Sequence, residues 1–326
     1  MASIKDVAKL ANVGLGTASR ALNNSGYVAP ETKERILDAA RQLNYTPSVL
    51  ARNLLKNRSG IIGVMIPSLD NPFFSRFTQL VESKLYAQGY KTMVCCTVNA
   101  DNSEQDYLEM LRNNLVDGII TATHSFNDED YLSGGKNIVS FDRELGRTIP
   151  LVRSDHEEGG RLAAQCFIEK GCRKVIQICG SDTVKGVIAV HDSHTVFHRI
   201  LTEHGVEVCV YHTDWNAWDS GYYHVVIQEV FRRWPDADGL FASDTLAVEA
   251  LSYAYAHQLS VPEQLKIISY DGMSITRNVY PQVTAVVQDI DALTTNAVEI
   301  LMSLIRKEKV EPETVVRVLW QKGGTV

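Results

Sequence analysis

Two short helical patterns, joined by a three-residue turn at 12–14, constrain the start of this chain more than any other feature. In the first pattern, small and apolar side chains recur at helical spacing: Ile4, Val7, Ala8 and Ala11. The second pattern runs from Leu15 to Leu22. Two helices this short, joined this tightly, are typical of a helix-turn-helix unit.

The expected helix ends carry matching signals. The Ser3 hydroxyl and the Asp6 carboxylate can accept hydrogen bonds from unpaired amides at the start of the first helix. Pro30 and Glu31 suit the start of a third helix, because proline fixes φ and negative charge favours a helix N-terminus. The apolar residues expected to pack this third helix on the first two are Ile36, Leu37, Ala40 and Leu43.

Charge is distributed unevenly along the chain. Residues 1–59 contain nine Lys and Arg against four Asp and Glu, a net charge of +5. The whole chain carries −7, so residues 60–326 carry −12. A basic head on an acidic body is expected where only the head meets polyanionic DNA. A three-helix bundle without a nucleic-acid ligand is the alternative that the helical pattern alone leaves open.

Beyond residue 60, short apolar runs alternate with helical stretches, one of them from Phe73 to Leu85. The runs expected to form strands are 61–66, 92–97, 117–122, 137–142, 150–155, 174–179, 206–211, 238–243 and 265–271. Strands separated by helices predict parallel sheets covered on both faces. A body of about 265 residues is too long for one modest domain and fits two similar lobes. The expected fold class is therefore α/β, with an all-α helix-turn-helix headpiece at the N-terminus.

Ligands of such parallel sheets bind beyond the carboxyl ends of the strands, where two lobes would face each other across a cleft. The residues expected there are 67–74, Asp142, Arg143, Trp215, Ser243, Asp244, Asp271 and Gln288. Carboxylates accept hydrogen bonds from hydroxyl groups, Arg donates them, and an aromatic ring covers the apolar face of a sugar. Taken singly, Asp271 could instead form a turn, and Trp215 could lie in the core.

The stretch SIKDVAKLANVGLGTASRALN at 3–23 resembles the headpiece of the LacI/GalR family of bacterial repressors, whose pattern is xIxDVAxxAxVxxxTxSRxLN. The resemblance continues through IIGVMIPSLDNPFF, DGIITATH, FASDTLAVEAL, ISYDG and VVQD. SFDRELGRTIPLVRSD and GGRLAAQ resemble the sucrose-operon repressors of that family. The resemblance implies a two-lobed body like that of periplasmic binding proteins, and a homodimer that binds double-stranded operator DNA.

The resemblance also implies how the chain is divided. The expected parts are a helix-turn-helix headpiece at 1–46, a hinge helix and linker at 47–59, and an effector-binding and dimerisation domain at 60–326. Within that domain, the expected ranges are 60–158 plus 290–318 for lobe 1, and 159–289 plus 319–326 for lobe 2. The chain is therefore expected to cross between the lobes more than once.

In a helix-turn-helix unit the second helix enters the major groove of DNA. The residues expected to contact DNA are Leu15, Gly16, Thr17, Ser19, Arg20 and Asn23 in the headpiece, and Ala51 and Leu54 in the hinge. Pro47 ends the preceding helix, and the two turns or so that 48–56 could form are marginal in isolation. The resemblance implies that Leu54 wedges between base steps in the minor groove. Packing of Leu54 in the protein core is the alternative.

The resemblance further implies that a sugar or sugar phosphate binds between the lobes. The contacts that it implies come from Phe73, Phe74, Asp142, Trp215, Asp271 and Gln288. The family usually carries an Arg-x-x-Gly-Phe element whose Arg holds the sugar, but the matching stretch here reads HDSHTVFHRIL. Anchoring the match on Phe197 puts Ser193 in place of that Arg, and a shift of two residues puts His191 there. Which of the two replaces it stays open.

The same stretch suggests a rival site. His191, His194 and His198 are spaced i, i+3 and i+7, so they would share one helical face, and three imidazoles could bind zinc. A solvated polar helix is the alternative. Because no Cys stands at ligand spacing, no metal and no cofactor are expected.

Other functional classes lack sequence support. The chain contains no nucleophile elbow, phosphate-cradling Gly loop or metalloprotease helix, so no enzyme is expected. The six cysteines are expected to be reduced, buried thiols. Without a signal peptide or an 18-residue apolar run, a cytoplasmic location without membrane contact is expected.

The sequence therefore predicts a transcriptional regulator that represses a carbohydrate operon, with sucrose as one candidate. A small sugar-like effector is expected to change its operator affinity by linkage between two sites. One alternative is a periplasmic-type sugar-binding protein, which would share the lobes and lack the headpiece. The other is a sugar-processing enzyme, which would need a working pair of carboxyl groups.

Overall fold

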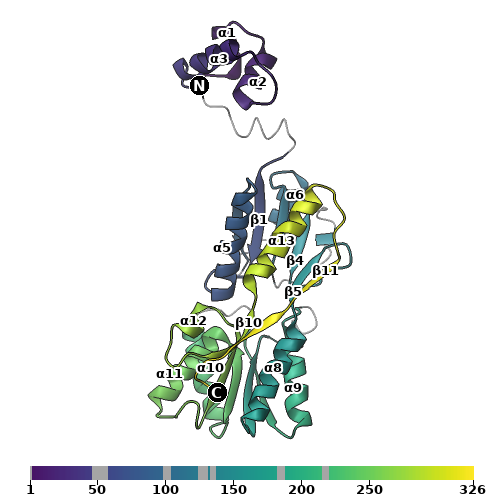
Figure 1. Cartoon of the computed structure of the whole chain (residues 1–326). Helices are drawn as coiled ribbons and strands as arrows, with labels where there is room; N and C mark the ends of the chain where they lie inside the picture. Colours follow the sequence, from purple (N-terminus) through teal and green to yellow (C-terminus); the bar gives the residue numbers. More distant parts are fainter. Residues whose placement is uncertain are drawn as a thin grey trace. The chain divides into compact units, whose positions relative to one another are not determined.

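The computed structural model describes residues 2–45, 58–97, 104–123, 131–132, 137–181, 188–214 and 220–326. The chain divides into two compact units, Met1–Gly60 and Ile61–Val326, and each has its own hydrophobic core (Figure 1). Ala51, Leu54 and Trp215, which the sequence predicts to be functional, lie outside the described residues.

Three helices form the described part of the first unit: α1 (Ile4–Leu10), α2 (Leu15–Asn23) and α3 (Pro30–Gln42). The start of α1 is capped as predicted, because the Ser3 hydroxyl accepts from the Asp6 amide and the Asp6 carboxylate accepts from the Ser3 amide at 2.8 Å. The core that joins the helices consists of Val7, Ala8, Ala11, Ala18, Ala21, Ile36, Ala39 and Ala40. The small alanine side chains let the three helices approach closely, so the predicted helix-turn-helix headpiece is confirmed.

The prediction that Leu37 packs inward is wrong. Its side chain is 40% exposed, whereas Ile36, Ala39 and Ala40 are buried. Successive helical residues point about 100° apart. A buried stripe that contains residues 36 and 40 therefore leaves Leu37 on the solvent side of α3.

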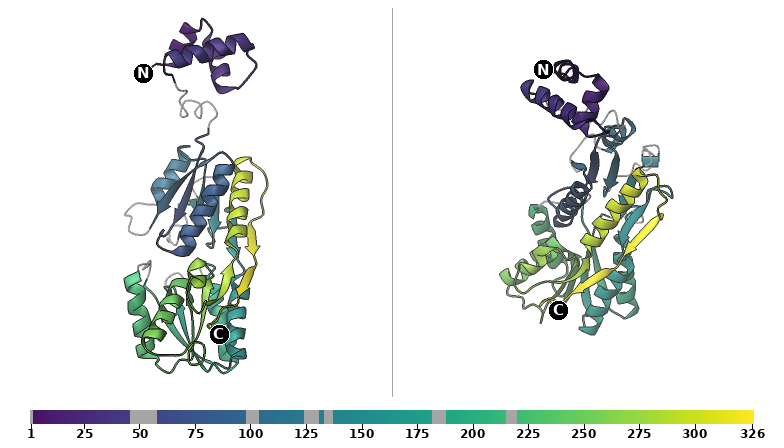
Figure 2. Two further views of the ribbon diagram at one scale, coloured as in Figure 1. Left: turned by 60° about the vertical axis from the view of Figure 1, so that its left-hand side comes forward. Right: turned by 45° about the horizontal axis from the view of Figure 1, so that its top comes forward.

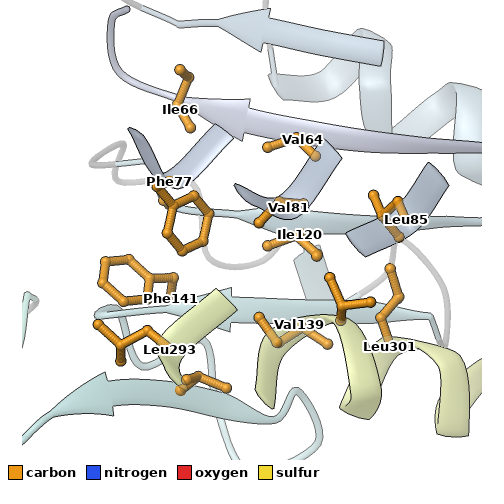
Figure 3. Packing of buried hydrophobic residues seen from close by; sticks show 14 of the residues in the cluster. Val64, Ile66, Phe77, Val81, Leu85, Ile120, Val139, Phe141, Leu293 and Leu301 are labelled. Atoms are coloured by element: carbon orange, nitrogen blue, oxygen red, sulfur yellow. The ribbon is translucent and has the colours of Figure 1, made fainter. Parts of the chain in front are cut away.

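The first lobe of the second unit is built on a six-stranded parallel sheet in the order β11-β5-β4-β3-β1-β2. Its elements are β1 (Ile61–Ile66), α5 (Pro72–Ala87), β2 (Lys91–Cys96), α6 (Glu104–Arg112), β3 (Gly118–Thr121), β4 (Ile138–Phe141), β5 (Leu151–Ser154), α13 (Ile290–Ile305) and β11 (Glu313–Val316). Helices α5 and α13 cover one face of the sheet and α6 packs on the other (Figure 1). Figure 3 shows the first of these interfaces, where Phe77 and Leu301 meet the strand residues Val64, Ile120 and Val139.

The second lobe repeats this architecture with the strand order β12-β10-β9-β8-β6-β7. Its elements are α8 (His156–Glu169), β6 (Lys174–Cys179), α9 (His191–Glu203), β7 (Glu207–His212), α10 (Ser220–Arg233), β8 (Gly239–Ser243), α11 (Asp244–Ala256), β9 (Lys266–Asp271), α12 (Ser274–Arg277), β10 (Thr284–Gln288) and β12 (Val318–Gln321). Helices α8 and α9 pack on one face, and α10 and α11 pack on the other. The predicted α/β fold with two lobes is confirmed.

One strand departs from the predicted parallel arrangement, because β12 runs antiparallel to β10. Only Arg317 separates β11 in the first sheet from β12 in the second, so the chain continues from one lobe into the other (Figure 2). The carboxyl ends of the other strands of the second sheet face the first lobe. A strand that enters from the first lobe therefore has to run against them.

The chain passes between the lobes at 154–156, 288–290 and 316–318. Strands β5 and β10 end at two of these crossings, so the carboxyl ends of both sheets face the space between the lobes. This is where parallel sheets bind ligands. Within the described ranges, no helix has the length and apolar character needed to span a membrane.

Candidate functional site

A cavity of about 170 Å³ lies between the two lobes. Its apolar and aromatic wall consists of Phe73, Phe74, Phe141, Ile178, Ile188, Val190, Tyr223 and Leu246. The polar side chains that line it are Asn71, Asp142, Ser181, His191, His194, Thr213, Asp214, Ser243, Tyr270, Asp271 and Gln288. Both lobes contribute to this lining, so a ligand held here would contact both.

The cavity brings together many of the residues predicted from the sequence: Phe73, Phe74, Asp142, His191, Ser243, Asp271 and Gln288. Three individually predicted residues, Arg143, Ser193 and Asp244, do not line it. The lining residues Phe141, Thr213 and Tyr270 were missed, although they stand at or next to the ends of β4, β7 and β9. A listing of every strand end would have found them.

The aromatic wall is positioned by the start of α5. The Asn71 side chain caps this helix, because its Oδ1 accepts from the Phe73 amide at 2.8 Å and from the Phe74 amide at 3.4 Å. The Phe73 ring packs edge to face on Phe74 at 5.5 Å and stacks on Phe141 of β4 at 5.6 Å between centroids. The cap thus fixes an apolar surface of the kind that covers one face of a sugar ring.

Asp142 follows β4 with a positive φ of 56°. Its Oδ1 lies 2.9 Å from His156 Nε2, and His156 Nδ1 lies 2.7 Å from the Tyr270 hydroxyl. All three groups are satisfied if His156 Nε2–H donates to Asp142 and Tyr270 donates to Nδ1. His156 is fully buried and was not singled out from the sequence, although it directly follows a predicted strand. It links two cavity residues that come from different lobes.

Asp271 ends β9 with a φ of 100°. Its Oδ1 accepts from Gln288 Nε2 at 2.7 Å, and Gln288 Oε1 accepts from the Ser154 hydroxyl of β5 at 2.7 Å. Burial raises the pKa of Asp271 well above its ordinary value, and the charge of Asp244 raises it further. A chain of hydrogen bonds therefore runs from the cavity carboxyl of the second lobe to the first lobe.

Asp244 was predicted to face the cleft beside Ser243, but only Ser243 lines the cavity. The Asp244 carboxyl accepts from the Gly272 amide at 3.1 Å and from the Met273 amide at 2.5 Å. Its burial raises its pKa to about 7. Asp244 thus holds the turn that follows Asp271, and its charge also raises the pKa of the Asp271 carboxyl in the cavity.

Arg143 was expected to donate hydrogen bonds in the cleft, but its side chain does not line the cavity. Its side chain is only 1% exposed, and its guanidinium carbon lies 5.6 Å from the centre of the Tyr131 ring. The Tyr131 hydroxyl donates to Glu104 at 2.7 Å inside the first lobe. Asp142 follows β4 with a positive φ, and at this turn of the backbone Arg143 lies inside the lobe whereas Asp142 lines the cavity.

His191 and Ser193, the two candidates for the position of the family Arg, lie in different surroundings in the first turn of α9. His191 lines the cavity, whereas Ser193 is fully buried and donates its hydroxyl hydrogen to the Val190 carbonyl at 2.7 Å. A Cβ on Gly160 of α8 would lie 2.2 Å from the Ser193 carbonyl oxygen. Ser193 therefore lies at the close contact of α8 with α9 and does not reach the cavity.

The three histidines of the rival zinc site do not gather at the cavity. His191 and His194 both line it, with ring centres 6.0 Å apart, but His198 is exposed. Burial lowers the pKa of His194 to about 3, and the neighbouring His191 contributes. Across the described part of the chain, no group of three His, Cys, Asp or Glu side chains is placed to hold a metal ion.

Replacing Ser193 with Arg is expected to destabilise the protein by about 3 kcal/mol or more. The larger side chain would overpack the contact of α8 with α9, and its charge would be buried there. Ser193→Ala is the matched control, with an expected cost of about 1 kcal/mol for the lost hydrogen bond. Thermal or urea unfolding measures both. A Ser193→Arg protein as stable as the wild type would contradict the close packing of α8 on α9.

The first unit presents one face of α2 to solvent. Leu15, Gly16 and Arg20 are exposed, with Leu15 47% exposed. Thr17, Ser19 and Asn23 are half-buried, and Asn23 donates to the Ser19 hydroxyl at 3.3 Å. Arg20 Nε donates to the Gly16 carbonyl at 3.3 Å. The exposed side of α2 thus presents an apolar side chain (Leu15), an uncovered glycine backbone (Gly16) and a cationic side chain (Arg20).

Two family descriptions match the chain. Residues 3–48 match "Bacterial regulatory proteins, lacI family", and residues 164–325 match "Periplasmic binding protein-like domain". A solved structure of a periplasmic binding protein/LacI transcriptional regulator from Alkaliphilus metalliredigens, complexed with D-xylulofuranose, is 26% identical with a TM-score of 0.72. The matched region covers 82% of this chain and 99% of the chain in that structure.

Two curated relatives match over nearly the whole length. The ribose operon repressor of Halalkalibacterium halodurans is 34% identical over 95% of this chain and 92% of the relative. The sucrose operon repressor of Streptococcus mutans is 32% identical over 100% of both chains. With this extent of similarity and with the headpiece described above, the protein belongs to the lacI family of bacterial regulatory proteins.

Proposed function

We propose that this protein represses a carbohydrate-utilisation operon, and that a small sugar-like effector bound between its lobes changes its affinity for operator DNA. One observation carries the proposal: a basic helix-turn-helix headpiece and a body with a polar, aromatic-walled cavity occur in one chain. The names of the ribose and sucrose operon repressors support the carbohydrate class. The D-xylulofuranose complex supports a sugar as ligand of such a body.

The headpiece would bind DNA through α2. Leu15, Gly16 and Arg20 lie on its exposed side, and Thr17, Ser19 and Asn23 border them. In a helix-turn-helix unit these positions meet base edges and phosphates of the major groove. Two copies of the chain would bind the two half-sites of a pseudo-palindromic operator as a homodimer.

The cavity would couple the effector to DNA binding. Asp142 comes from the first lobe and Asp271 from the second, so an effector that contacts both favours one arrangement of the lobes. If operator DNA favours another arrangement, the two ligands oppose each other by linkage. A coupling free energy of about 1–3 kcal/mol changes operator affinity by about 5–150-fold.

We also propose that the protein acts by binding and not by turnover. The relatives are transcriptional repressors, and a sugar-binding protein without a regulatory role would not need a headpiece. Incubation of the protein with mono- and disaccharides, followed by chromatography, tests this directly. Conversion of any sugar would favour the enzyme alternative.

Selection of bound fragments from a random DNA library tests the central proposal. We expect a pseudo-palindromic consensus, which then serves as a labelled probe for fluorescence anisotropy. Sugars added to the preformed complex are expected to change its dissociation constant. Failure to enrich any DNA sequence would contradict the proposed role as a transcriptional regulator. If a consensus is found but no sugar changes its dissociation constant, only the proposed class of effector is contradicted.

Arg20→Ala is expected to weaken specific operator binding by about 1–3 kcal/mol, because Arg20 is the one long cationic side chain among the proposed α2 contacts. Anisotropy titrations at fixed salt concentration measure the loss. Arg41→Ala is the matched control, since Arg41 lies in the last turn of α3 and pairs with Asp38. Equal affinities of the Arg20→Ala and wild-type proteins would remove Arg20 from the proposed contacts.

A further inference from the structure

The described lining of the cavity contains acidic side chains and no Lys or Arg. Three carboxyl groups line it, those of Asp142, Asp214 and Asp271. No Lys or Arg occurs among the described residues of the lining. Asp142 belongs to the first lobe and Asp271 to the second, so a ligand between the lobes meets acidic groups from both sides.

Two arginines that stand near Asp142 in the sequence, Arg143 and Arg153, contact other groups of the first lobe. Arg143 lies against the Tyr131 ring inside this lobe, at 5.6 Å. Arg153 Nε donates to Glu313 Oε1 at 2.5 Å, across the β5–β11 pair. Neither side chain is part of the described cavity lining. Among the described residues, the lining therefore offers carboxyl groups and no Lys or Arg, so a cationic group of a ligand would find acidic partners there.

Other lining groups also favour a ligand that donates hydrogen bonds. His194 Nδ1 is buried without a hydrogen-bond partner in the described structure. With its pKa lowered to about 3 by burial and by His191, the His194 ring is neutral, and one of its nitrogens can accept a hydrogen bond. The faces of Phe73 and Phe141 attract cations as well as apolar ring faces.

Building on the proposed function, we propose that the effector is a hydroxylated amine, an amino or imino sugar whose protonated nitrogen lies between Asp142 and Asp271. Its ring would lie against the Phe73 and Phe141 wall. Burial and the charge of Asp244 raise the pKa of Asp271, and an ammonium group beside it would offset both effects. A sugar phosphate would instead bring negative charge into a cavity that already holds acidic groups.

Calorimetry of the full-length protein with matched sets of sugars tests the proposal. Each set contains a hexose, its 2-amino form and its neutral N-acetyl form, in the gluco, galacto and manno series, and 1-deoxynojirimycin and glucose 6-phosphate complete the panel. The pH is held below the pKa of the amines. We expect at least one amine to bind about tenfold or more tightly than its neutral counterparts, because charged hydrogen bonds are the stronger ones.

Variants test whether the tighter binding of the amine depends on Asp271. Asp271→Asn keeps an oxygen acceptor and removes the charge, so it is expected to reduce the advantage of the amine about tenfold and to affect the neutral sugars less. Glu203→Gln removes a carboxylate from the exposed end of α9 and is expected to leave the advantage unchanged. Lys185→Gln tests for a cation beyond the described residues, which include no Lys or Arg in the lining. It is expected to leave the affinity for every ligand of the panel unchanged.

Three results would overturn the proposal: no amine of the panel binds in the millimolar range, every neutral sugar binds at least as tightly as its amine, or glucose 6-phosphate binds in a manner that Lys185→Gln abolishes. Titrations with operator DNA distinguish failure of the amine proposal from failure of the proposed function. A neutral sugar that releases operator DNA would leave the proposed function standing. An amine that binds without changing operator affinity would contradict the proposed function and leave the ligand class standing.

Discussion

Asp271→Ala is expected to weaken effector binding by about 10- to 100-fold, the loss of one charged hydrogen bond or more. The carboxyl lines the cavity and is oriented by Gln288 and, through it, by Ser154 of the other lobe. The substitution therefore removes both a ligand contact and a link between the lobes. Operator affinity without effector is expected to stay close to that of the wild type, since the headpiece is a separate compact unit.

The measurement is a pair of titrations, effector by calorimetry and operator by anisotropy. Glu263→Ala is the matched control, because it removes an exposed carboxylate from the same lobe. An Asp271→Ala protein that binds its effector as tightly as the Glu263→Ala protein would remove the cavity from the proposed mechanism. Loss of operator binding as well would indicate a folding defect and not a selective loss of response.

Phe77→Ala is expected to lower the free energy of unfolding of the second unit by about 3–5 kcal/mol, as for other fully buried phenylalanines. Phe77 has no exposed surface and lies beside Phe141 (Figure 3), with the two ring centres 4.9 Å apart. Its ring centre lies 6.2 Å from that of Phe73. It supports the aromatic wall of the cavity from behind. Effector affinity is therefore expected to fall together with stability.

Urea unfolding followed by tryptophan fluorescence measures this loss, because all four tryptophans of the chain lie beyond residue 60. Phe77→Leu keeps most of the volume and is expected to cost less than about 1.5 kcal/mol. If the alanine variant were no less stable than the leucine variant, the packing of α5 on the sheet would not be as described.

The headpiece could be predicted from local sequence. Ser3 and Asp6 stand three residues apart, as a helix cap requires, and the alanines at 8, 11, 18 and 21 lie on the faces where the two short helices pack. The same holds for the strands, since apolar runs bounded by helical patterns fix where β1 to β9 begin and end within a residue or so. These features depend on neighbours in the chain, which a sequence displays directly.

The position of each polar group relative to the cavity could be predicted only in part. That Asp142 and Asp271 stand at strand ends follows from the pattern, because the carboxyl ends of parallel strands meet at one edge. That Asp244 and Arg143 point elsewhere does not, since each stands next to a cavity residue in the sequence and turns away through a single backbone step. The direction of a side chain at a strand end depends on the local φ and ψ angles, such as the positive φ of Asp142.

The sequence by itself determined the family, the α/β class and the strand ends at which a ligand would bind. Only the tertiary structure decided that His191 lines the cavity and Ser193 does not, because Ser193 is buried where α8 packs on α9 and its hydroxyl donates to the Val190 carbonyl. It alone placed His156 between Asp142 and Tyr270, which are far apart in the chain. Contacts between distant segments depend on how whole layers pack, and local pattern carries no record of that packing.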